Sequence, residues 1–389
     1  MFDSTLKVGI VAAEKSGDSL GANLISSISQ KHNVEFFGVV GPKMIEAGCT
    51  PIASIENLSI MGFQDVILQL PQLIHLKNSI CRALIKNEID IFVGVDSPSL
   101  NLPIAAKLKS KMPELKVVQY VAPQLWAWRP ERIKKVKKIV DDLLVLFPFE
   151  QEYFSNFGVK SQFVGHPVAN KIKSAKKSLG CQDFSDLKEI NLALLPGSRW
   201  NEVRHHSDVL FKSIKLFKNS INKKINLKIG AADKKIADYL EVCAKEHGQE
   251  GVFYIDDSIN CLIDSDLAVV SSGTVALEAF LCSKPMVVCY KTSKFNYFLF
   301  KRLISLENIS LPNILMNSDI VPELIQDNLT AQSVATQLML WTIDSQRIIS
   351  LRQAGSNFLK VLDCNSSQYV NDYFDSLMNQ LIEKKWVKS

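Results

Sequence analysis

The sequence predicts an α/β protein made of two units of similar size, each built around a parallel sheet. Short apolar strands alternate with amphipathic helices along most of the chain. The strands are apolar almost throughout, which is typical of strands covered on both faces. The chain has 389 residues, of which 47% are hydrophobic and 22% are charged. This composition is that of a globular protein, and the length suits two domains better than one.

The first half of the chain opens with a buried strand, a glycine-bearing turn and an amphipathic helix from about Ser19 to Lys31. Further apolar strands follow, separated by helical stretches. Strands are expected at Lys7–Ala13, Glu35–Val40, Ile89–Val95, Lys116–Val121 and Asp142–Phe147. Such alternation predicts one parallel sheet with helices on both faces.

The pattern breaks at Gly165-His166-Pro167, and residues 171–188 are polar and rich in lysine and serine. We therefore expect a first domain over residues 1–165 and a second over residues 166–363, with a cleft between them. In the second half, strands are expected at Asn191–Leu195, Asn226–Gly230, Leu267–Val270 and Pro285–Tyr290, and helices at Glu202–Asn219 and Val275–Cys282. After Leu329 the pattern is helical to the end.

The net charge is +5, from 45 basic and 40 acidic residues. This mild excess does not indicate nucleic-acid binding, although it would favour an anionic partner or surface. Eight cysteines are present without a C-x-x-C pair, and several lie in apolar runs. We therefore expect buried, reduced thiols in a cytoplasmic protein. The sequence shows no signal-peptide pattern and no apolar run of about 18 residues, so no segment is expected to cross a membrane.

The turn after the first strand carries Glu14, Ser16, Gly17 and Asp18. Ligands of open α/β sheets lie at the carboxyl ends of strands, where this turn is expected. Gly17 would permit close approach of the backbone, and Asp18 could cap the next helix. The turn matches neither a Walker A loop nor a G-x-G-x-x-G fingerprint, so an ordinary capped turn is the alternative.

Asp96 follows directly after the apolar strand Ile89–Val95. A carboxylate at this edge of a sheet can accept a proton from an attacking hydroxyl, so Asp96 is the candidate general base. The alternative is that Asp96 caps a helix starting at Pro103, because Asp-Ser-Pro suits the start of a helix.

Two loops of the second half have the composition of anion-binding sites. Ser198 and Arg199 follow one apolar strand, and Gly273 and Thr274 follow another. Small residues at a helix N-terminus present backbone N–H groups and the positive end of the helix dipole, and arginine adds a bidentate cation. We expect phosphate binding at both loops. The alternative for Arg199 is a solvated surface arginine.

Glu278 lies four residues after Thr274, so it is one helical turn away. A carboxylate there could hold ribose hydroxyls, and the alternative is a charge on an exposed helix face. A nucleotide would then bind the second domain, with the chemistry in the cleft. His205 and His206 are adjacent and would point apart on a helix, and the sequence contains neither D-x-D nor H-E-x-x-H. We therefore expect no metal and no cofactor.

Two segments suggest contact with a membrane surface. The stretch Arg129–Lys138 is strongly basic, and a basic stretch combined with an apolar one suits an enzyme that rests on an anionic bilayer. For each segment alone, a core helix or a solvated face is the alternative. The apolar residues expected to face the membrane are Val66, Ile67, Leu68, Leu70, Leu73 and Ile74.

Ten stretches, in order along nearly the whole chain, match motifs of a known family. They are Glu14–Asp18, Gly38–Met44, Met61-Gly62, Val93–Asp96, Tyr120–Arg129, Phe163–His166, Leu195–Arg199, Ser272–Glu278, Lys284–Val288 and Ser310–Asn313. The Trp-Ala-Trp-Arg block ending at Arg129 and the Leu-Pro-Gly-Ser-Arg block ending at Arg199 are the most specific. On these residues the chain resembles the lipid-A-disaccharide synthases, glycosyltransferases of bacterial outer-membrane lipid synthesis.

The resemblance implies a glycosyltransferase-B fold with two Rossmann-like domains, in which the last helix, residues 364–389, crosses back to the first domain. It implies inverting transfer of a sugar from UDP-2,3-diacylglucosamine to the 6-hydroxyl of 2,3-diacylglucosamine 1-phosphate, without a metal. It also implies a Gram-negative bacterium and a cytoplasmic enzyme, peripheral on the inner face of the cytoplasmic membrane. The sequence does not decide between a monomer and a homodimer.

Carried over by position, Asp96 resembles the general base of the family, and Arg199, Glu278 and Asn313 resemble its UDP-binding residues. Ser16, Gly17 and Asp18 would line the acceptor side, and residues 66–74 would face lipid. The chain departs from the family pattern at two positions. Ala13 stands where a glycine is expected, and Ser99 stands where an acid is expected. The second departure would leave Asp96 to act without a neighbouring acid.

Two other functions remain open at this stage. A UDP-N-acetylglucosamine 2-epimerase of the same fold would act on a UDP-sugar alone. A UDP-sugar-binding or membrane scaffold protein would have no activity that depends on Asp96.

Overall fold

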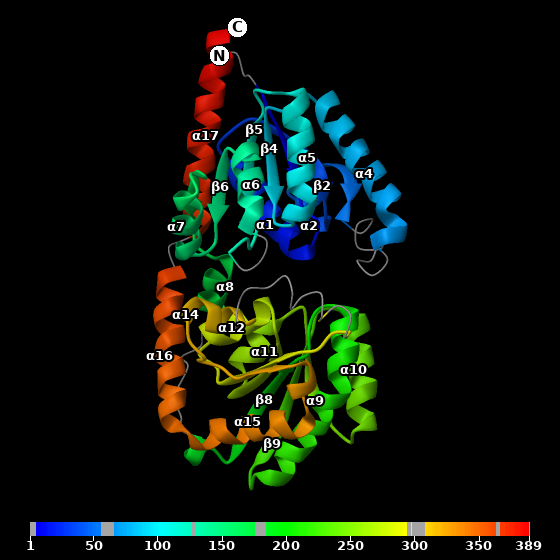
Figure 1. Ribbon diagram of the computed structural model, residues 1–389, viewed down its shortest axis with the longest axis vertical. Coiled ribbons are helices and arrows are strands. Elements are labelled where there is room, and N and C mark those ends of the chain that lie inside the picture. Colours follow the sequence, from blue (N-terminus) through cyan, green and yellow to red (C-terminus); the bar gives the residue numbers. More distant parts are fainter. Residues whose placement is uncertain are drawn as a thin grey trace. The chain divides into compact units, whose positions relative to one another are not determined.

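The structure is a computed structural model, shown in Figure 1. It describes residues 5–55, 66–126, 130–175, 184–293, 297, 308–362 and 366–388, apart from the side chains of residues 66–73, 366–367 and 385–388. The chain folds into two compact units. The first comprises residues 1–166 and 364–389, and the second comprises residues 167–363.

A parallel sheet forms the centre of the first unit. Its strands, within the described residues, have the order β3-β2-β1-β4-β5-β6-β7. From β1 to β3 successive strands are therefore added on one side of β1, and from β4 to β7 they are added on its other side. The strands are β1 (Leu6–Val11), β2 (Val34–Val40), β3 (Thr50–Ser54), β4 (Ile91–Val95), β5 (Lys116–Tyr120), β6 (Asp142–Val145) and β7 (Ser161–Phe163).

Helices cover the first sheet on both faces, as the alternating pattern predicts. The helices are α1 (Lys15–Ser29), α2 (Pro42–Glu46), α4 (Val66–Lys86), α5 (Pro98–Lys111), α6 (Ile133–Ile139), α7 (Pro148–Asn156) and α17 (Ser366–Lys388), with a 3₁₀ turn at Pro130–Arg132. Side chains of α4, α5 and α6 form one apolar core with alternate residues of the strands. Helix α1 begins at Lys15 and not at the expected Ser19, because Glu14 already takes the N-cap position.

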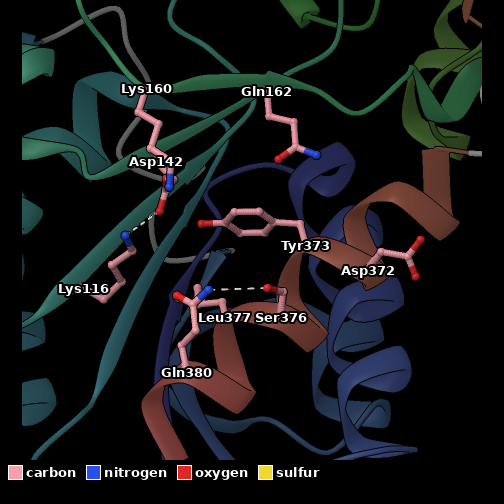
Figure 2. A pocket seen from close by; sticks show the side chains of 9 residues that line it. All are labelled: Lys116, Asp142, Lys160, Gln162, Asp372, Tyr373, Ser376, Leu377 and Gln380. Atoms are coloured by element: carbon pink, nitrogen blue, oxygen red, sulfur yellow. Dashed lines mark hydrogen bonds and ion pairs between the residues drawn. The ribbon is translucent and has the colours of Figure 1, made fainter. Parts of the chain in front are cut away.

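Helix α17, red in Figure 1, belongs to the first unit although it ends the chain. It packs on α1, and just beyond the end of α1 its Asp375 forms an ion pair with Lys31 and a hydrogen bond of 3.2 Å with His32. Other residues of α17, among them Tyr373, line a pocket at the amino ends of β5 to β7. Tyr373 points toward Asp142 in this pocket (Figure 2).

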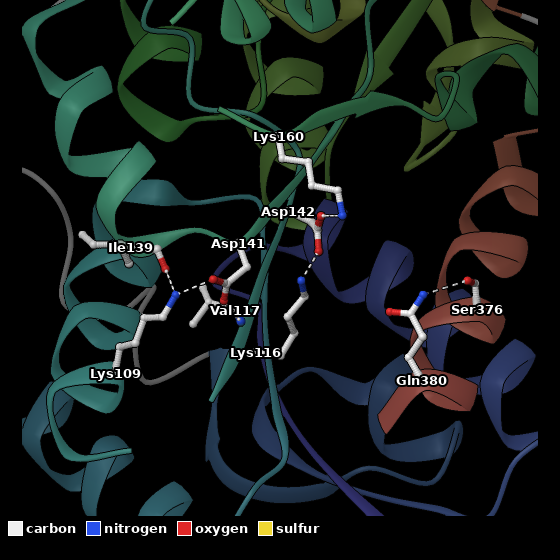
Figure 3. Close-up of polar contacts among 9 residues, drawn as sticks. All are labelled: Lys109, Lys116, Val117, Ile139, Asp141, Asp142, Lys160, Ser376 and Gln380. Atoms are coloured by element: carbon white, nitrogen blue, oxygen red, sulfur yellow. Dashed lines mark hydrogen bonds and ion pairs between the residues drawn. The ribbon is translucent and has the colours of Figure 1, made fainter. Parts of the chain in front are cut away.

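Three charged residues that line the pocket beneath α17 form an ion-pair cluster. The buried Asp142 carboxylate lies 2.5 Å from Lys116 Nζ and 2.6 Å from Lys160 Nζ (Figure 3). Burial would raise the pKa of Asp142, but the two lysines together lower it. These opposite charges pair between α17 and the sheet, at the edge opposite Asp96.

The second unit repeats the architecture. Its parallel sheet has, within the described residues, the order β10-β9-β8-β11-β12-β13. The strands are β8 (Glu189–Leu195), β9 (Lys224–Ala231), β10 (Gly251–Ile255), β11 (Leu267–Ser271), β12 (Met286–Tyr290) and β13 (Glu323–Ile325). The helices are α8 (Pro167–Ala175), α9 (Trp200–Ser220), α10 (Lys234–Glu246), α11 (Ser258–Ile263), α12 (Thr274–Leu281), α14 (Leu311–Met316), α15 (Ala331–Ile343) and α16 (Ser345–Leu362), with 3₁₀ turns at Phe184–Asp186 and Gln326–Asn328.

The expectation of an α/β protein with two parallel sheets is confirmed, and the strands that the sequence analysis missed have one property in common. They are the strands at the four edges: β3 and β7 in the first sheet, β10 and β13 in the second. None of them is fully buried along its length. They lack the continuous apolar run by which an inner parallel strand is recognised.

The described cysteines are free and buried, as expected. Burial raises the pKa of Cys49 and of Cys261 to about 12, so these thiols stay protonated. They act as small apolar side chains of the two cores.

Candidate active site at the switch points of the two sheets

Each sheet has one point where the strand order reverses. In the first sheet it lies between the neighbouring strands β1 and β4, and in the second between β8 and β11. Loops that leave such neighbours at their carboxyl ends diverge to opposite sides, and ligands of open α/β sheets bind there. The loops singled out from the sequence follow these four strands: Glu14–Asp18, Asp96, Ser198–Arg199 and Gly273–Thr274.

The loop after β1 has an exposed and a buried part. Glu14 and Ser16 are exposed, whereas Gly17 and Asp18 are buried. A Cβ at Gly17 would lie 3.2 Å from Ala12 Cβ, so this residue brings α1 close to the strand end. Gly17 therefore allows this close packing of helix on strand, and its approach to an acceptor stays a prediction.

The role expected of Asp18 as a cap of the following helix is wrong. Asp18 already lies inside α1, and its carboxylate accepts hydrogen bonds from the backbone N–H groups of Gly41, Lys43 and Met44 at 2.8–3.1 Å. It thus caps the N-terminus of α2, which is distant in sequence. A direct contact of Asp18 with an acceptor stays a prediction.

Asp96 lies immediately beyond β4 in a left-handed backbone conformation, with φ of 53°, and Ser97 follows with φ of 40°. Such conformations cost about 1–3 kcal/mol each in residues other than glycine. Helix α5 begins at Pro98 with Ser97 as its N-cap, so the alternative in which Asp96 caps a helix from Pro103 is wrong. Strain of this kind clusters at functional sites, which keeps Asp96 a candidate site residue.

The Asp96 carboxyl is largely shielded from solvent. Burial raises the pKa of Asp96 above its ordinary value, although the Ser97 backbone N–H acts in the opposite direction. A carboxyl with a raised pKa can accept a proton more readily than an exposed aspartate. Ser99, the position where an acid was expected, is exposed on the first turn of α5.

Sequence reasoning missed two buried amides beside Asp96, those of Asn101 and Gln119. Both donate to the Asp96 carbonyl oxygen, at 2.7 and 3.0 Å. The signal that could have found Gln119 is its place as a polar residue inside a strand buried on both faces. Asn101 Oδ1 is buried without a hydrogen-bond partner in the described structure, which costs about 1–3 kcal/mol.

A further carboxyl of the first unit holds the start of the Trp-Ala-Trp-Arg block. Glu150 accepts from Trp126 Nε1 at 3.1 Å and from the backbone N–H groups of Leu146 and Phe147 at 3.2 Å. Burial raises the pKa of Glu150 to about 7. Residues 127–129 of the block lie outside the described residues.

In the second unit, the loop after β8 leads into the 21-residue helix α9. Gly197 has φ of 131°, a conformation that favours glycine, and a Cβ there would lie 2.8 Å from Glu202 Oε2. Ser198 and Arg199 are exposed at the helix N-terminus. The Arg199 side chain is 74% exposed, and its Nη1 lies 3.1 Å from Glu202 Oε1. The loop thus presents a cation and backbone N–H groups at one point.

The loop after β11 reaches the same edge of the sheet, because β11 is the direct neighbour of β8. Gly273 and Thr274 are exposed at the N-terminus of α12, and apart from its chain neighbours nothing lies within 4 Å of a Cβ built at Gly273. Ser272 is engaged, since its Oγ donates to the Ile309 carbonyl at 3.1 Å. The two helix N-termini together provide the geometry of an anion site.

Glu278 lies one turn into α12 and is partly buried. Its Oε2 accepts a hydrogen bond of 2.6 Å from Ser258 Oγ. Burial raises the pKa of Glu278, with Ser258 and Lys171 acting in the opposite direction. The alternative of a charge on an exposed helix face is therefore wrong.

Asn313 is 1% exposed and fully engaged within the unit. Its amide exchanges hydrogen bonds with the Val321 backbone and donates to Glu323 Oε1 at 2.8 Å. Glu323 in turn accepts from Ile309 and Ser310. In this structure Asn313 supports the segment before α14, and its direct contact with UDP stays a prediction.

His206, set aside in the sequence analysis as a poor metal ligand, links two strand ends of the second unit. Its Nδ1 lies 2.7 Å from the Pro196 carbonyl, and its Nε2 accepts from the Lys291 backbone N–H at 2.8 Å. Only the neutral ring with its proton on Nδ1 satisfies both contacts. Burial lowers the pKa of His206, which favours this neutral form.

The structure describes part of the surface expected to meet a membrane. Val66, Ile67, Leu68, Leu70 and Leu73 lie in α4, but their side chains are outside the described residues, whereas Ile74 is 51% exposed. Helix α6 buries Ile133 and Val136 and exposes its lysines, namely Lys134, Lys135, Lys137 and Lys138. In the described part of the chain, no helix combines the length and hydropathy needed to cross a membrane. The described residues likewise contain no group of three or more His, Cys, Asp or Glu that could hold a metal ion.

Comparison with protein families gives a match over most of the chain. The family model described as lipid-A-disaccharide synthetase matches residues 8–372. A lipid-A-disaccharide synthase of Wigglesworthia glossinidia brevipalpis is 36% identical over 97% of this chain and 99% of its own length. Those of Vibrio parahaemolyticus and Haemophilus influenzae are 35% and 33% identical, over 87% and 93% of this chain and 89% and 94% of their own lengths.

Solved structures show the same fold at low sequence identity. A structure described as a UDP-N-acetylglucosamine 2-epimerase of Listeria monocytogenes has a TM-score of 0.61 at 12% identity, covering 98% of both chains. The calicheamicin glycosyltransferase CalG4 has a TM-score of 0.60 at 13% identity, covering 97% of this chain and 99% of its own. The expected glycosyltransferase-B fold is thereby confirmed.

Proposed function

The chain belongs to the lipid-A-disaccharide synthetase family and is a glycosyltransferase that forms the lipid A disaccharide, and we propose how its two switch points divide that reaction. The second unit binds the UDP part of UDP-2,3-diacylglucosamine. The first unit carries the general base for the 6-hydroxyl of 2,3-diacylglucosamine 1-phosphate. The observation that supports this division is that the four candidate loops fall at the two switch points.

The donor half of the proposal rests on the exposed groups after β8 and β11. Arg199 and the N-termini of α9 and α12 would contact the diphosphate, with Ser198, Gly273 and Thr274 lining it. Glu278, one turn deeper, would accept hydrogen bonds from the ribose. Positive charge at this place stabilises the diphosphate as it leaves.

The acceptor half rests on Asp96. Its ionised carboxyl accepts the proton of the 6-hydroxyl while the hydroxyl oxygen attacks the anomeric carbon. The bond from that carbon to the UDP oxygen breaks, and UDP leaves with the electron pair. Attack from the face opposite the leaving group inverts the anomeric configuration, and Glu14, Ser16 and Gly17 would border the acceptor.

The test is a coupled assay that reads UDP release with both lipid substrates, with and without the acceptor. We expect release only when the acceptor is present. An epimerase, whose fold is similar, would act on the UDP-sugar alone, and its sequence relatives would not be the synthases matched here. A binding or scaffold protein would release no UDP in either case.

We further propose that the enzyme works at the inner face of the cytoplasmic membrane, because both substrates carry acyl chains. The lysines exposed on α6 and the apolar start of α4 would contact an anionic bilayer. Lys134→Glu with Lys138→Glu, or Leu68→Glu with Leu70→Glu, should shift the protein from anionic vesicles to solution in a flotation assay. Lys215→Glu, on an exposed part of α9, is the control. Unchanged flotation of both double variants would exclude this surface.

A further inference from the structure

The carboxyl ends of β4 and β5 concentrate unusual backbone conformations. Asp96 and Ser97 after β4, and Val121 after β5, have φ of 53°, 40° and 75°. Val121 is β-branched, for which positive φ is especially unfavourable. Such residues persist only where their surroundings fix them. The surroundings at this point are two buried side-chain amides.

The first amide is that of Asn101, on the first turns of α5, and it is 0% exposed. Its Nδ2 lies 2.7 Å from the Asp96 carbonyl oxygen and 3.3 Å from those of Val11 and Val95. This single donor group therefore links the ends of β1 and β4, the two strands of the switch point.

The second amide is that of Gln119, on β5, and it is 2% exposed. Its Nε2 donates to the carbonyl oxygens of Asp96 at 3.0 Å and Val121 at 3.2 Å. The Asp96 carbonyl thus receives two amide donors from different elements. Together they hold the peptide plane between Asp96 and Ser97.

Gly94 makes room for both amides. A Cβ at this residue of β4 would lie 2.6 Å from Gln119 Oε1 and 2.8 Å from Asn101 Cβ. A side chain here would displace both donors. Residues of β4, α5 and β5 thus pack together so that two amides reach the Asp96 carbonyl oxygen.

We propose that Asn101 and Gln119 are positioning residues for the sugar transfer, which hold the strained backbone of Asp96 so that its carboxyl meets the acceptor hydroxyl. This proposal rests on the proposed role of Asp96. The amides touch neither substrate; they act through the orientation of the base, where a displacement of the order of 1 Å is costly.

The test is Gln119→Met, which keeps the length of the side chain and removes its donors. We expect kcat to fall about 10- to 100-fold, with the KM for the UDP-sugar and the affinity for UDP unchanged. Gln249→Met is the matched control, because Gln249 is also a buried glutamine but lies in the second unit before β10. It should keep the wild-type kcat. Asn101→Ser repeats the test on the other amide, so that the result does not depend on one variant folding.

A double-mutant cycle separates this proposal from the one on which it rests. Since Gln119 acts through Asp96, Gln119→Met should cause no further loss of kcat in an Asp96→Asn background. A full additional loss there, or a wild-type kcat in both single amide variants, would overturn the positioning role. Wild-type turnover of Asp96→Asn alone would instead overturn the assignment of Asp96 as base.

Discussion

At the switch point of the first sheet, the chain passes through two successive strained residues, Asp96 and Ser97, whereas the loops at the second switch point turn at Gly197 and Gly273. In the described loops after β8 and β11, only Gly197 has a φ in the left-handed region, whereas Gly273 is extended with φ of 165°. Glycine relieves strain and leaves backbone N–H groups accessible, which suits the binding of an anion. A strained side-chain-bearing residue suits a site where the direction of one carboxyl decides the rate.

The two switch points also differ in the charge and the exposure of their candidate side chains. The Asp96 carboxyl is shielded, and burial raises its pKa. Arg199, by contrast, extends into solvent beside a helix N-terminus. A shielded carboxyl is poised to exchange a proton, and an exposed cation is poised to meet a charged ligand. The comparison therefore predicts that changes in the first unit reduce turnover and that changes in the second reduce binding.

Asp96→Asn should have the largest effect. We expect kcat to fall by about 10²–10⁴, the contribution of a general base, while UDP still binds with wild-type affinity. Steady-state kinetics with both lipid substrates and titration calorimetry with UDP measure the two quantities. Loss of UDP affinity in this variant would mean that the two switch points do not act separately.

The pH profile of the wild type sharpens this prediction. Because burial raises the pKa of Asp96, kcat/KM should decline on acidification at a higher pH than an exposed aspartate would cause. The ionised carboxyl is the active form, so activity is lost as the pH falls through the raised pKa. A profile that stays flat down to about pH 4, the ordinary range of an exposed aspartate, would contradict the assignment.

Arg199→Ala tests the other side of the comparison. We expect UDP affinity to fall by about 1.5–3 kcal/mol, the scale of a charge-assisted hydrogen bond, with the KM for the UDP-sugar rising to match. Arg204→Ala is the control, since Arg204 is an exposed arginine in α9, the helix that Arg199 precedes. Equal UDP affinity of the two variants by calorimetry would remove Arg199 from the binding site.

The inner strands and the loops after them could be predicted from the sequence, because a strand buried on both faces is a continuous apolar run. The edge strands could not. β7, for example, has three residues of which none is buried, so its pairing with β6 depends on the fold and not on local pattern. The same reasoning explains why α17 could be placed only through the family resemblance, since its packing partners Lys31 and His32 are more than 300 positions away.

Only part of the candidate site could be predicted, because local sequence pattern does not show contacts between distant parts of the chain. Asp96 and Arg199 were singled out because they interrupt a recognisable strand-to-helix pattern, and their roles stay predictions. Asn101 was missed because a single sequence does not distinguish a buried polar side chain from a solvated one. Gln119 was overlooked although it interrupts a strand that is buried on both faces, and His206 was considered only as a metal ligand. Asp18 was found with the wrong role, since the backbone groups that it caps belong to a helix that begins 24 positions later.

A buried acid, Glu150, holds a loop of the first unit, and a buried base, His206, holds a loop of the second. Glu150 holds Trp126 in the first unit, and burial raises its pKa to about 7. Between the unfolded value of about 4.3 and about 7, the folded protein keeps a proton that the unfolded chain has lost. Folding stability therefore falls as the pH rises through this window, by about 3–4 kcal/mol in total.

Glu150→Gln should remove this part of the pH dependence. As the pH rises from about 5 to about 7, the thermal unfolding midpoint of the variant should rise relative to that of the wild type. The test is how this difference in midpoint changes with pH, and not its size at one pH, because the new amide also changes the hydrogen bonds at every pH. Glu152→Gln, on the exposed side of α7, should keep the wild-type curve. A constant difference for Glu150→Gln would show that this carboxyl is ionised throughout the window.

His206→Gln should have the smallest effect, and one of the opposite sign. Burial lowers the pKa of His206, so below the unfolded value of about 6.5 the unfolded chain binds a proton that the folded ring resists. The stability that wild-type His206 contributes is therefore complete above that pH and declines on acidification. We expect His206→Gln to cost about 1 kcal/mol near pH 8, and the cost to shrink toward about pH 5.5, as measured by urea unfolding. His205→Gln, the exposed neighbour, should show no such convergence. A cost that grows on acidification would mean that the charged ring is accepted between Pro196 and Lys291, and that this loop is not held by the neutral form.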